Sequence, residues 1–205
     1  MLPVNTYVVW DETNEAAVID PGCYYKGEGE ELCDFIRNKG LNIKHLLNTH
    51  LHFDHVFGNP VIESSFGVEA EANEADQPWI TGLERRIAAF GMRFNTKVSP
   101  IKPEHFLNEG DTIRFGNTTL SIFHIPGHSP GSLVFYCSED GILFTGDVLF
   151  QGGVGRSDFG DGDHQALIDG IKKKLMVLPD STKVLSGHGP STTIGQERIG
   201  NPYIQ

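Results

Sequence analysis

Three histidines and one aspartate lie at closely spaced positions in one short segment of the sequence. The segment is Thr49-His50-Leu51-His52-Phe53-Asp54-His55, and it directly follows an apolar run. Residues two positions apart on an extended segment point to the same side, so His50 and His52 can bind one metal ion. A turn after them directs Asp54 and His55 toward a second ion. Any one of these histidines alone would be interpreted as an ordinary loop residue, but the set predicts a metal site.

Three further segments place a histidine or an aspartate directly after a strand-like run. His128 lies between glycines in residues 126–132, Asp147 ends a buried run, and His188 lies in residues 186–190. A carboxylate at the end of a buried strand is costly to bury unless it is paired or bound to a metal. A mixture of imidazole and carboxylate suits Zn²⁺, Fe or Mn²⁺ better than Ca²⁺ or Mg²⁺, which prefer oxygen ligands. The candidate metal ligands are His50, His52, Asp54, His55, His128, Asp147 and His188.

The other histidines are predicted to have ordinary roles. We expect His45, His105 and His164 at the surface, the last two because acidic residues lie beside them in the sequence. His124 lies within a predicted strand and is expected to pack there or to support a ligand from behind. Cys137 lies in an apolar strand and is expected to be a buried thiol.

Short strands separated by glycine-rich turns position these segments. Apolar and β-branched runs of strand length end at turn residues along most of the chain. Helical spacing of apolar residues predicts helices over residues 29–39, 73–94 and 163–178. Strands followed by a helix, and then the same order again, predict an α/β sandwich of sheets covered by helices. The predicted strands are residues 7–10, 17–20, 43–48, 112–115, 120–125, 133–137, 142–145 and 183–186.

Composition limits the function classes. The chain has 205 residues, 39% hydrophobic and 21% charged, which are ordinary values for one globular domain over residues 1–205. The net charge of −11 argues against binding to nucleic acid or to an anionic membrane. No apolar run approaches the ~18 residues that a membrane span needs. The three cysteines share no short spacing, so we expect a reducing, cytoplasmic location.

The order of the candidate ligands resembles the metallo-β-lactamase superfamily, and within it the short, single-domain hydrolases similar to glyoxalase II. Further support comes from the stretch Ile19-Asp20-Pro21-Gly22 and from residues 126–132, 152–159 and 186–202. The resemblance implies an αββα metallo-β-lactamase-like sandwich and two divalent metal ions. Zinc is the expected metal, with iron or manganese as alternatives. It assigns His50, His52 and His128 to the first ion, Asp54, His55 and His188 to the second, and Asp147 to both.

The resemblance implies a metal-dependent hydrolase that acts on a thioester such as S-D-lactoylglutathione, in the manner of a hydroxyacylglutathione hydrolase. Two cations acidify a water molecule and polarise the substrate carbonyl, so no protein nucleophile is needed. The expected partner is a small-molecule thioester or thiol. The superfamily's zinc enzymes that hydrolyse antibiotics typically have a cysteine at the position of Asp147, which argues against drug hydrolysis here.

Three other functions use the same residues. Persulfide dioxygenases of the superfamily hold one Fe(II) through two histidines and a carboxylate, which would be His50, His128 and Asp147 here. RNA processing shares the ligands, but the net charge of −11 counts against it. A purely structural metal site is the least expected, because structural zinc favours closed, cysteine-rich ligand sets.

Two segments outside the ligand set have open interpretations. In glyoxalase II the loop after the bridging aspartate offers a basic residue to a glutathione carboxylate, and Arg156 occupies that place here. Alternatively, Arg156 pairs with Asp158, Asp161 or Asp163 and orders a glycine-rich loop. The segment 73–100 contains Trp79, Phe90, Met92 and Phe94. It could close over the site as a lid, although packing onto the sheet is the simpler expectation.

Overall fold

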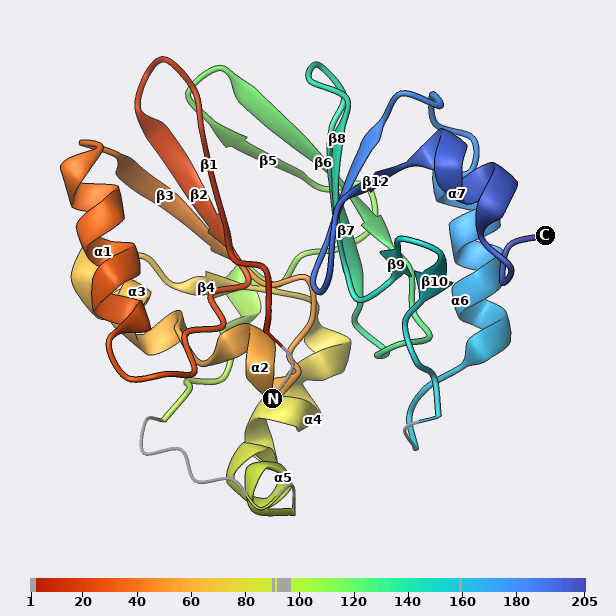
Figure 1. Ribbon diagram of the computed structural model, residues 1–205. Helices are drawn as coiled ribbons and strands as arrows, with labels where there is room; N and C mark the ends of the chain where they lie inside the picture. The colour runs from red at the N-terminus through yellow and green to blue at the C-terminus, as the bar shows by residue number, and fades with distance from the viewer. Residues whose placement is uncertain (1–2, 90, 92–96, 159) are drawn as a thin grey trace.

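Two β-sheets lie face to face in the computed structural model, which describes residues 3–89, 91, 97–158 and 160–205 (Figure 1). The first sheet has the strand order β1 (Tyr7–Trp10), β2 (Glu15–Ile19), β3 (Asn42–Leu47) and β4 (Ala70–Glu71). The second has the order β12 (Thr192–Thr193), β11 (Lys183–Ser186), β8 (Ile142–Gly146), β7 (Leu133–Cys137), β6 (Thr118–His124) and β5 (Thr112–Phe115). A short hairpin of β9 (Leu149–Phe150) and β10 (Gly153–Val154) follows β8.

Helices cover the outer side of each sheet. Helices α1 (Glu28–Asn38) and α3 (Asn59–Phe66) flank the first sheet, whereas α6 (His164–Gly170) and α7 (Ile194–Gly200) flank the second (Figure 1). The layers therefore follow the expected αββα order. The remaining helical elements are α2 (Phe53–Val56), α4 (Gln77–Thr81), α5 (Leu83–Ala89), the 3₁₀ turns η1 (Glu74–Asp76) and η2 (Pro103–His105), and the π-helical turn η3 (Ile171–Leu175), which continues α6.

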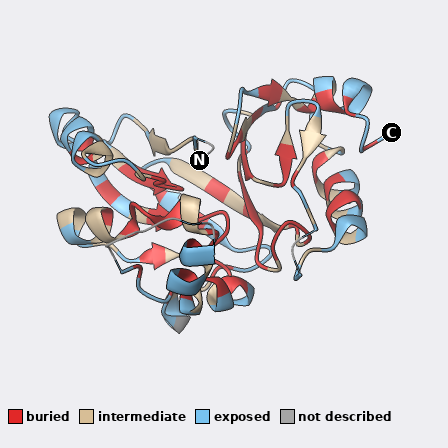
Figure 2. Cartoon of the chain, turned by 60° about the horizontal axis from the view of Figure 1, so that its bottom comes forward, coloured by how far each residue is buried: buried red, intermediate tan, exposed pale blue. Residues whose placement is uncertain are grey.

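Strand β2 shows how the sequence builds this sandwich. Ala16 and Val18 face the helices α1 and α3, while Ala17 and Ile19 face the second sheet. All four are fully buried, because successive side chains of a strand point to opposite faces and both faces of β2 are covered. Figure 2 shows the same burial along the strands and on the inner sides of the helices.

The candidate ligand segments leave the two sheets at one edge. Strand β3 runs parallel to β2, and β11 runs parallel to β8, so the carboxyl ends of β3, β8 and β11 carry the loops that follow them. Backbone hydrogen bonds join these loops: Leu133 N donates to Thr49 O at 2.7 Å, and Gly187 N donates to Gly146 O at 2.7 Å. The segments after the strands are therefore held close together although they are far apart in the sequence.

All eight predicted strands are present, with ends within two residues of the predicted ones. The helix predicted over 29–39 is α1. The long helix predicted over 73–94 is wrong as a single element, because Gly82 separates α4 from α5, and its last part lies outside the described residues. The helix predicted over 163–178 continues only to Leu175, with its second half in π-helical form.

Three helices were not predicted. Helix α2 has four residues and coincides with the ligand segment, α3 contains Pro60 in its first turn, and α7 has two glycines and few apolar residues. Their apolar periodicity is too weak to identify from sequence. Among the described residues, no helix is both long and apolar enough to cross a membrane.

Candidate metal centre

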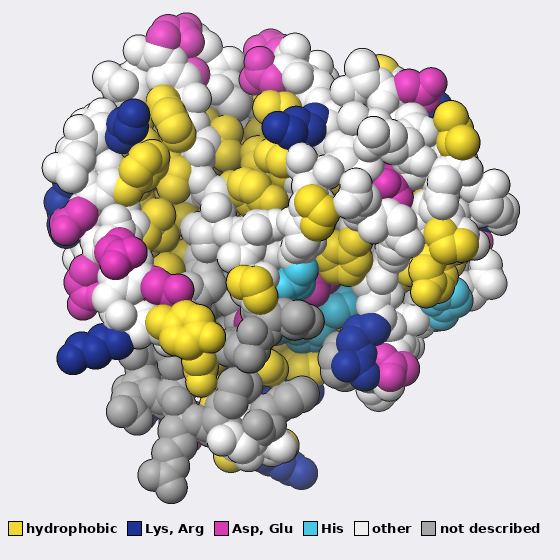
Figure 3. Space-filling model, in the orientation of Figure 1, with side chains coloured by type: hydrophobic (Ala, Val, Ile, Leu, Met, Phe, Trp, Pro, Cys, Tyr) yellow, Lys and Arg dark blue, Asp and Glu magenta, His cyan; other side chains and the backbone are white. Residues whose placement is uncertain are grey.

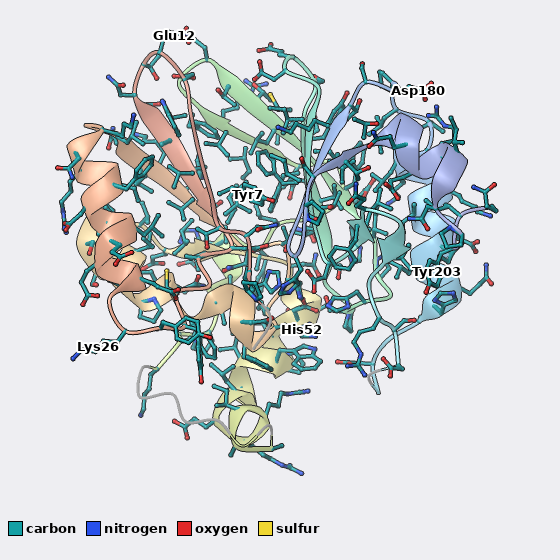
Figure 4. All side chains as sticks on the ribbon, viewed as in Figure 1. Tyr7, Glu12, Lys26, His52, Asp180 and Tyr203 are labelled. Carbon is teal, nitrogen blue, oxygen red and sulfur yellow. The ribbon has the colours of Figure 1, made fainter. Side chains whose placement is uncertain are left out.

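All of the predicted metal ligands converge at the sheet edge. They form three overlapping groups in which the candidate ligand atoms lie within 4.8 Å of one another. Figure 4 shows His52 between the two sheets and the helices below them, surrounded by other side chains with nitrogen and oxygen atoms. The groups are His50, His52 and His128; His50, His55 and Asp147; and Asp54, His55 and His188.

The first metal group, His50, His52 and His128, is made of imidazoles alone. Nε2 of His128 lies 3.3 Å from Nε2 of His50 and 2.9 Å from Nδ1 of His52. Tetrahedral zinc with Zn–N bonds of about 2.05 Å separates its nitrogen ligands by roughly 3.4 Å. All three residues are buried. The nitrogens are therefore spaced as ligands of one ion.

The second metal group, Asp54, His55 and His188, contains a carboxylate and is more open. Oδ2 of Asp54 lies 3.5 Å from Nε2 of His188. The side chains of Asp54 and His188 are 19% and 17% exposed, whereas His55 is fully buried. This group therefore reaches the protein surface, and Figure 3 shows histidine atoms accessible in the middle of this face.

Asp147 lies between the two metal groups. Its Oδ2 is 3.6 Å from Nε2 of His128 in the first group and 3.5 Å from Nε2 of His188 in the second. Its Oδ1 is 3.5 Å from Nε2 of His55. One carboxylate thus faces both groups, which is the position that a bridging ligand needs.

Two buried polar atoms in the centre support the presence of a cation. Nε2 of His55 and Oδ1 of Asp147 have no hydrogen-bond partner among the described residues. Leaving such an atom unsatisfied costs about 1–3 kcal/mol. A metal ion bound by both atoms would remove this cost, so the residues present fit a divalent cation.

Asp20, for which the sequence predicted no role, supports candidate ligands of both metal groups. Its Oδ1 accepts a hydrogen bond from Thr49 N at 2.8 Å. Its Oδ2 accepts one from Thr49 Oγ1 at 2.6 Å and lies 3.0 Å from His55 Nδ1. Thr49 Oγ1 is in turn 3.1 Å from His50 Nδ1. Partners of this kind fix the ring orientation and the tautomer of a histidine ligand. The available signal was a carboxylate at the end of a buried strand, the same signal that identified Asp147.

Asp76 connects two ligand loops and was also missed. This buried carboxylate accepts hydrogen bonds from Leu51 N at 3.1 Å, Ser129 Oγ at 2.9 Å and Gly131 N at 2.6 Å. Burial raises its pKa, against the effect of these donors. Asp76 therefore holds the His50–His52 segment against the His128 loop. No sequence signal marks it, because it lies inside a predicted helix far from either loop.

Backbone carbonyls orient two more ligands. Nδ1 of His128 lies 2.8 Å from the carbonyl oxygen of Arg156, and Nδ1 of His188 lies 2.8 Å from that of Pro3. If each Nδ1 carries the proton and donates it, Nε2 keeps its lone pair for a metal. His124 contacts the loop that carries His128, since its Nε2 lies 2.8 Å from the carbonyl oxygen of Pro130.

The two metal groups differ in their electrostatics. Burial lowers the pKa values of His50 and His128, and it lowers that of His52 to about 3. Burial also opposes the charge on His55 and His188, but nearby carboxylates outweigh it. Asp20 and Asp147 hold the pKa of His55 well above its usual value, and Asp147 and Asp54 raise that of His188 to about 10. Without a bound cation, the lowered pKa values favour neutral imidazoles in the first group. The raised pKa values favour protonated imidazoles at His55 and His188 in the second.

Arg156 forms an ion pair in the structure. Its Nε donates to Asp158 Oδ1 at 2.7 Å and its terminal nitrogen donates to Asp158 Oδ2 at 2.8 Å, with both side chains exposed. Asp163 instead caps helix α6. This is the contact expected from a loop-ordering role, and binding of a substrate carboxylate stays a prediction.

The other predicted residues lie away from the ligands. His45 pairs with Glu71, His105 with Glu69, and His164 lies 3.2 Å from Ser157 Oγ. Cys137 is a buried thiol, as expected.

Trp79 is buried and packs on His52, with ring centroids 4.0 Å apart, so this part of the segment 73–100 covers the first metal group. Phe90, Met92 and Phe94 lie outside the described residues.

The sequence matches the metallo-beta-lactamase superfamily over residues 1–188. It is 41% identical over 202 residues to the hydroxyacylglutathione hydrolase GloC of Haemophilus influenzae, which covers 98% of this chain and 92% of that protein. It is also 34% identical to the probable metallo-hydrolase YqgX of Bacillus subtilis, over 99% of this chain and 93% of that one.

Solved structures agree with the sequence matches. The BLEG-1 B3 metallo-beta-lactamase superposes with a TM-score of 0.88 at 36% identity and covers 98% of this chain and 94% of its own. The protein TTHA1623 in a di-iron-bound form gives a TM-score of 0.84 at 35% identity, with 98% and 96% covered. Fold and sequence therefore lead to one assignment: the chain belongs to the metallo-β-lactamase superfamily, as a metallo-hydrolase with histidine-rich groups able to hold metal ions.

Proposed function

We propose that the protein hydrolyses thioesters at a centre of two divalent cations, with S-D-lactoylglutathione as the reference substrate. The observation that carries this proposal is the position of Asp147, whose Oδ2 lies 3.6 Å from a histidine of the first metal group and 3.5 Å from a histidine of the second. The name of the GloC relative supports the choice of substrate.

Each residue has a defined role in this proposal. His50, His52 and His128 would hold one cation, Asp54, His55 and His188 the other, and Asp147 would contact both. The cations would supply the acidity that activates water near neutral pH and would polarise the substrate carbonyl. Asp20 keeps the rings of the first and second groups in place through Thr49 and His55. Zinc is the first choice of metal, with iron and manganese as alternatives.

A protein nucleophile is not needed, and the nearby candidates are unsuited to the task. Cys23 lies beside Asp54 in a cavity next to the centre, but burial raises its pKa to about 12. It is therefore a thiol at neutral pH, and the thiol is a much poorer nucleophile than the thiolate. The hydroxyl of Ser129 donates to Asp76, so its proton is already engaged.

The same residues leave two other reactions to be tested. His50, His128 and Asp147 are close enough to hold a single Fe(II) for persulfide oxidation, since Nε2 of His128 lies 3.3 Å from His50 and 3.6 Å from Asp147. The similarity to a B3 metallo-beta-lactamase makes β-lactam hydrolysis a second control reaction.

A single set of assays separates these reactions. Purified protein is loaded with zinc, iron or manganese, its metal content is measured by mass spectrometry, and thiol release from S-D-lactoylglutathione is followed under argon. We expect two metal equivalents and oxygen-independent thiol release. Oxygen uptake with glutathione persulfide and no thioester turnover would replace the proposal with the iron dioxygenase. Turnover of a chromogenic cephalosporin alone would replace it with β-lactam hydrolysis.

A further inference from the structure

A cavity of about 380 Å³ opens beside the second metal group. Val4 lies on one side of it, Tyr24 and Tyr25 on another, and Leu32 and Glu28 come from helix α1. Asp54 of the second metal group forms part of its wall. We call this cavity the tyrosine pocket. Asp54 therefore belongs both to the wall of the pocket and to the second metal group.

The walls of the tyrosine pocket are held in place by hydrogen bonds and close packing. Thr6 Oγ1 donates to the carbonyl oxygen of Asp20 at 2.9 Å and accepts from Gly22 N at 3.1 Å. A Cβ at Gly22 would lie 3.1 Å from Cβ of Val4 and 3.0 Å from the carbonyl oxygen of Asp54. Glycine at position 22 therefore allows the segments that carry Val4, Gly22 and Asp54 to pack together. These contacts form the wall of the pocket without a ligand.

The aromatic wall is also fixed. The rings of Tyr24 and Tyr25 have centroids 5.1 Å apart, and Tyr24 lies 5.6 Å from Phe57. Glu28 Oε2 accepts a hydrogen bond from Tyr25 N at 2.8 Å, which sets the carboxylate beside this wall. The pocket is thus lined by apolar and aromatic surface, with Glu28 beside the tyrosines and Asp54 toward the metal centre.

Among the residues that the structure describes, none that lines the tyrosine pocket is a cation, and the two charged side chains of the lining, Glu28 and Asp54, are both acidic. A cation bound to Asp54 would balance that carboxylate, so Glu28 sets the sign of the charge in the pocket. Lys26 follows Tyr25 in the sequence, but Figure 4 shows it at the outer edge of the molecule, away from His52. An anionic group entering the pocket would be repelled by Glu28, and none of the described lining side chains would offset that repulsion.

A cationic side chain lies next to the ring that covers the first metal group. The guanidinium carbon of Arg86 lies 3.7 Å from the ring centroid of Trp79, which itself packs on His52 of the first metal group. Arg86 makes no ion pair with any residue that the structure describes. A carboxylate-bearing carrier such as glutathione is therefore better accommodated over the first metal group, which leaves the acyl group to the tyrosine pocket.

We propose that the tyrosine pocket binds the acyl group of the substrate, that it selects apolar acyl groups larger than lactoyl, and that Glu28 excludes anionic ones. This inference rests on the proposed thioester hydrolysis and names the acyl class of its substrate. Burying extra methylene groups against Val4, Leu32 and the two tyrosines gains binding that the small, hydroxylated lactoyl group cannot supply.

The test uses glutathione thioesters that differ only in their acyl group, because a common carrier removes carrier effects. We expect kcat/KM to be about tenfold higher for hexanoyl than for lactoyl, and lowest for succinyl, which adds a carboxylate. Glu28→Lys should raise the succinyl-to-hexanoyl ratio about tenfold, the effect of reversing one screened charge, and Glu28→Gln should give a smaller rise. Glu31→Lys is the matched control, since Glu31 is exposed on the same helix and does not line the pocket.

A binding experiment separates failure of the pocket from failure of the proposed reaction. Calorimetry with S-hexylglutathione and S-(3-carboxypropyl)glutathione, which cannot be hydrolysed, should show the same preference and the same response to Glu28→Lys. Preference in binding without hydrolysis of any thioester would retain the pocket and reject the reaction. Hydrolysis with equal rates for hexanoyl and succinyl thioesters, or an equal response to Glu31→Lys, would overturn the pocket assignment.

Discussion

The two metal groups contain different residue types, although both lie next to Asp147. The first, His50, His52 and His128, consists of buried imidazoles and is covered by Trp79. The second contains Asp54 and is exposed toward the tyrosine pocket. We therefore expect the first group to retain its ion more strongly. The second group should exchange its ion more readily and lie next to the acyl group of the substrate.

The supporting residues follow the same division. Asp20 contacts His55 of the second group directly, and it reaches His50 of the first group only through Thr49. Around the first group the support also includes Asp76, which holds two ligand loops together. The loops of the first group are therefore joined to each other through Asp76, whereas His55 and His188 of the second group contact Asp20 and the carbonyl oxygen of Pro3.

The largest effect is expected from Asp147, because it is common to both groups. Asp147→Asn keeps the size of the side chain but removes the charge that offsets two cations, so both ions should be lost or weakened. We expect kcat/KM to fall by more than about 100-fold, beyond the usual cost of removing a residue that only supports a ligand. Metal content and turnover are measured beside Asp169→Asn, an exposed carboxylate on α6. Two retained ions with normal activity would reject the shared position of Asp147.

The next largest effects are expected from Asp20, which contacts His55 of the second group, and from Thr49, which contacts His50 of the first. Asp20 has a positive φ of 49°, a conformation that asparagine tolerates, so Asp20→Asn should leave the backbone intact. We expect a loss of metal affinity of about 10- to 100-fold at the second group. Thr49→Val, which removes the hydroxyl between Asp20 and His50, should weaken the first group more than the second. Stepwise metal titration by calorimetry measures both, and equal losses at both steps in each variant would remove the distinction.

Metal removal tests the same division kinetically. Because Asp54 and His188 are partly exposed while the first group is buried, a chelator should remove one equivalent quickly and the other slowly. The rates are followed by mass spectrometry of the retained metal. Trp79→Ala should speed up the slow phase and leave the fast phase unchanged. A single phase for both ions would show that the groups do not differ in access.

The residues that converge in the two metal groups could be picked out from the sequence because they are rare residue types in short segments. His50 to His55 and the segments around His128, Asp147 and His188 each follow a strand, so local pattern was enough to place them. A sandwich of sheets covered by helices could also be predicted, because eight of the strands and two of the helices have their own periodicity, and the family resemblance implied the αββα order.

The residues that support the ligands could not be predicted in the same way. Asp76 acts through hydrogen bonds to Leu51 and Gly131, which lie far from it in the sequence. The tyrosine pocket is formed by residues 3–6, 22–25 and 28–32, and nothing in these segments alone indicates that they meet. Such features depend on the tertiary structure, whereas the ligands were visible as local motifs.

A small effect is expected from Arg156, whose side chain pairs with Asp158 in solvent although its carbonyl oxygen supports His128. Arg156→Ala should change KM for a glutathione thioester by less than about threefold, because exposed ion pairs contribute little. Gly155→Ala is the informative partner, since a Cβ there would overlap the carbonyl oxygen of Asp147 and should lower metal content. A rise in KM of about 10- to 100-fold in Arg156→Ala would instead assign a substrate carboxylate to this residue.

The smallest effect should come from a histidine–carboxylate pair outside both metal groups, which serves as their reference. Nδ1 of His45 lies 2.7 Å from Glu71 Oε1. Burial opposes the charge on this ring, but Glu71 raises its pKa above the usual value. A raised folded-state pKa contributes stability below the unfolded value of about 6.5, and this stability is lost as the pH rises through the folded value. Glu71→Gln should therefore lower the stability of the metal-loaded protein by about 0.5–1 kcal/mol near pH 6 and by much less near pH 9. Thermal unfolding at the two pH values measures the difference.

Metal content should not change in Glu71→Gln, because the His45–Glu71 pair touches none of the candidate ligands. A loss of metal in this variant would show that the first group depends on β3 as well as on its own loops.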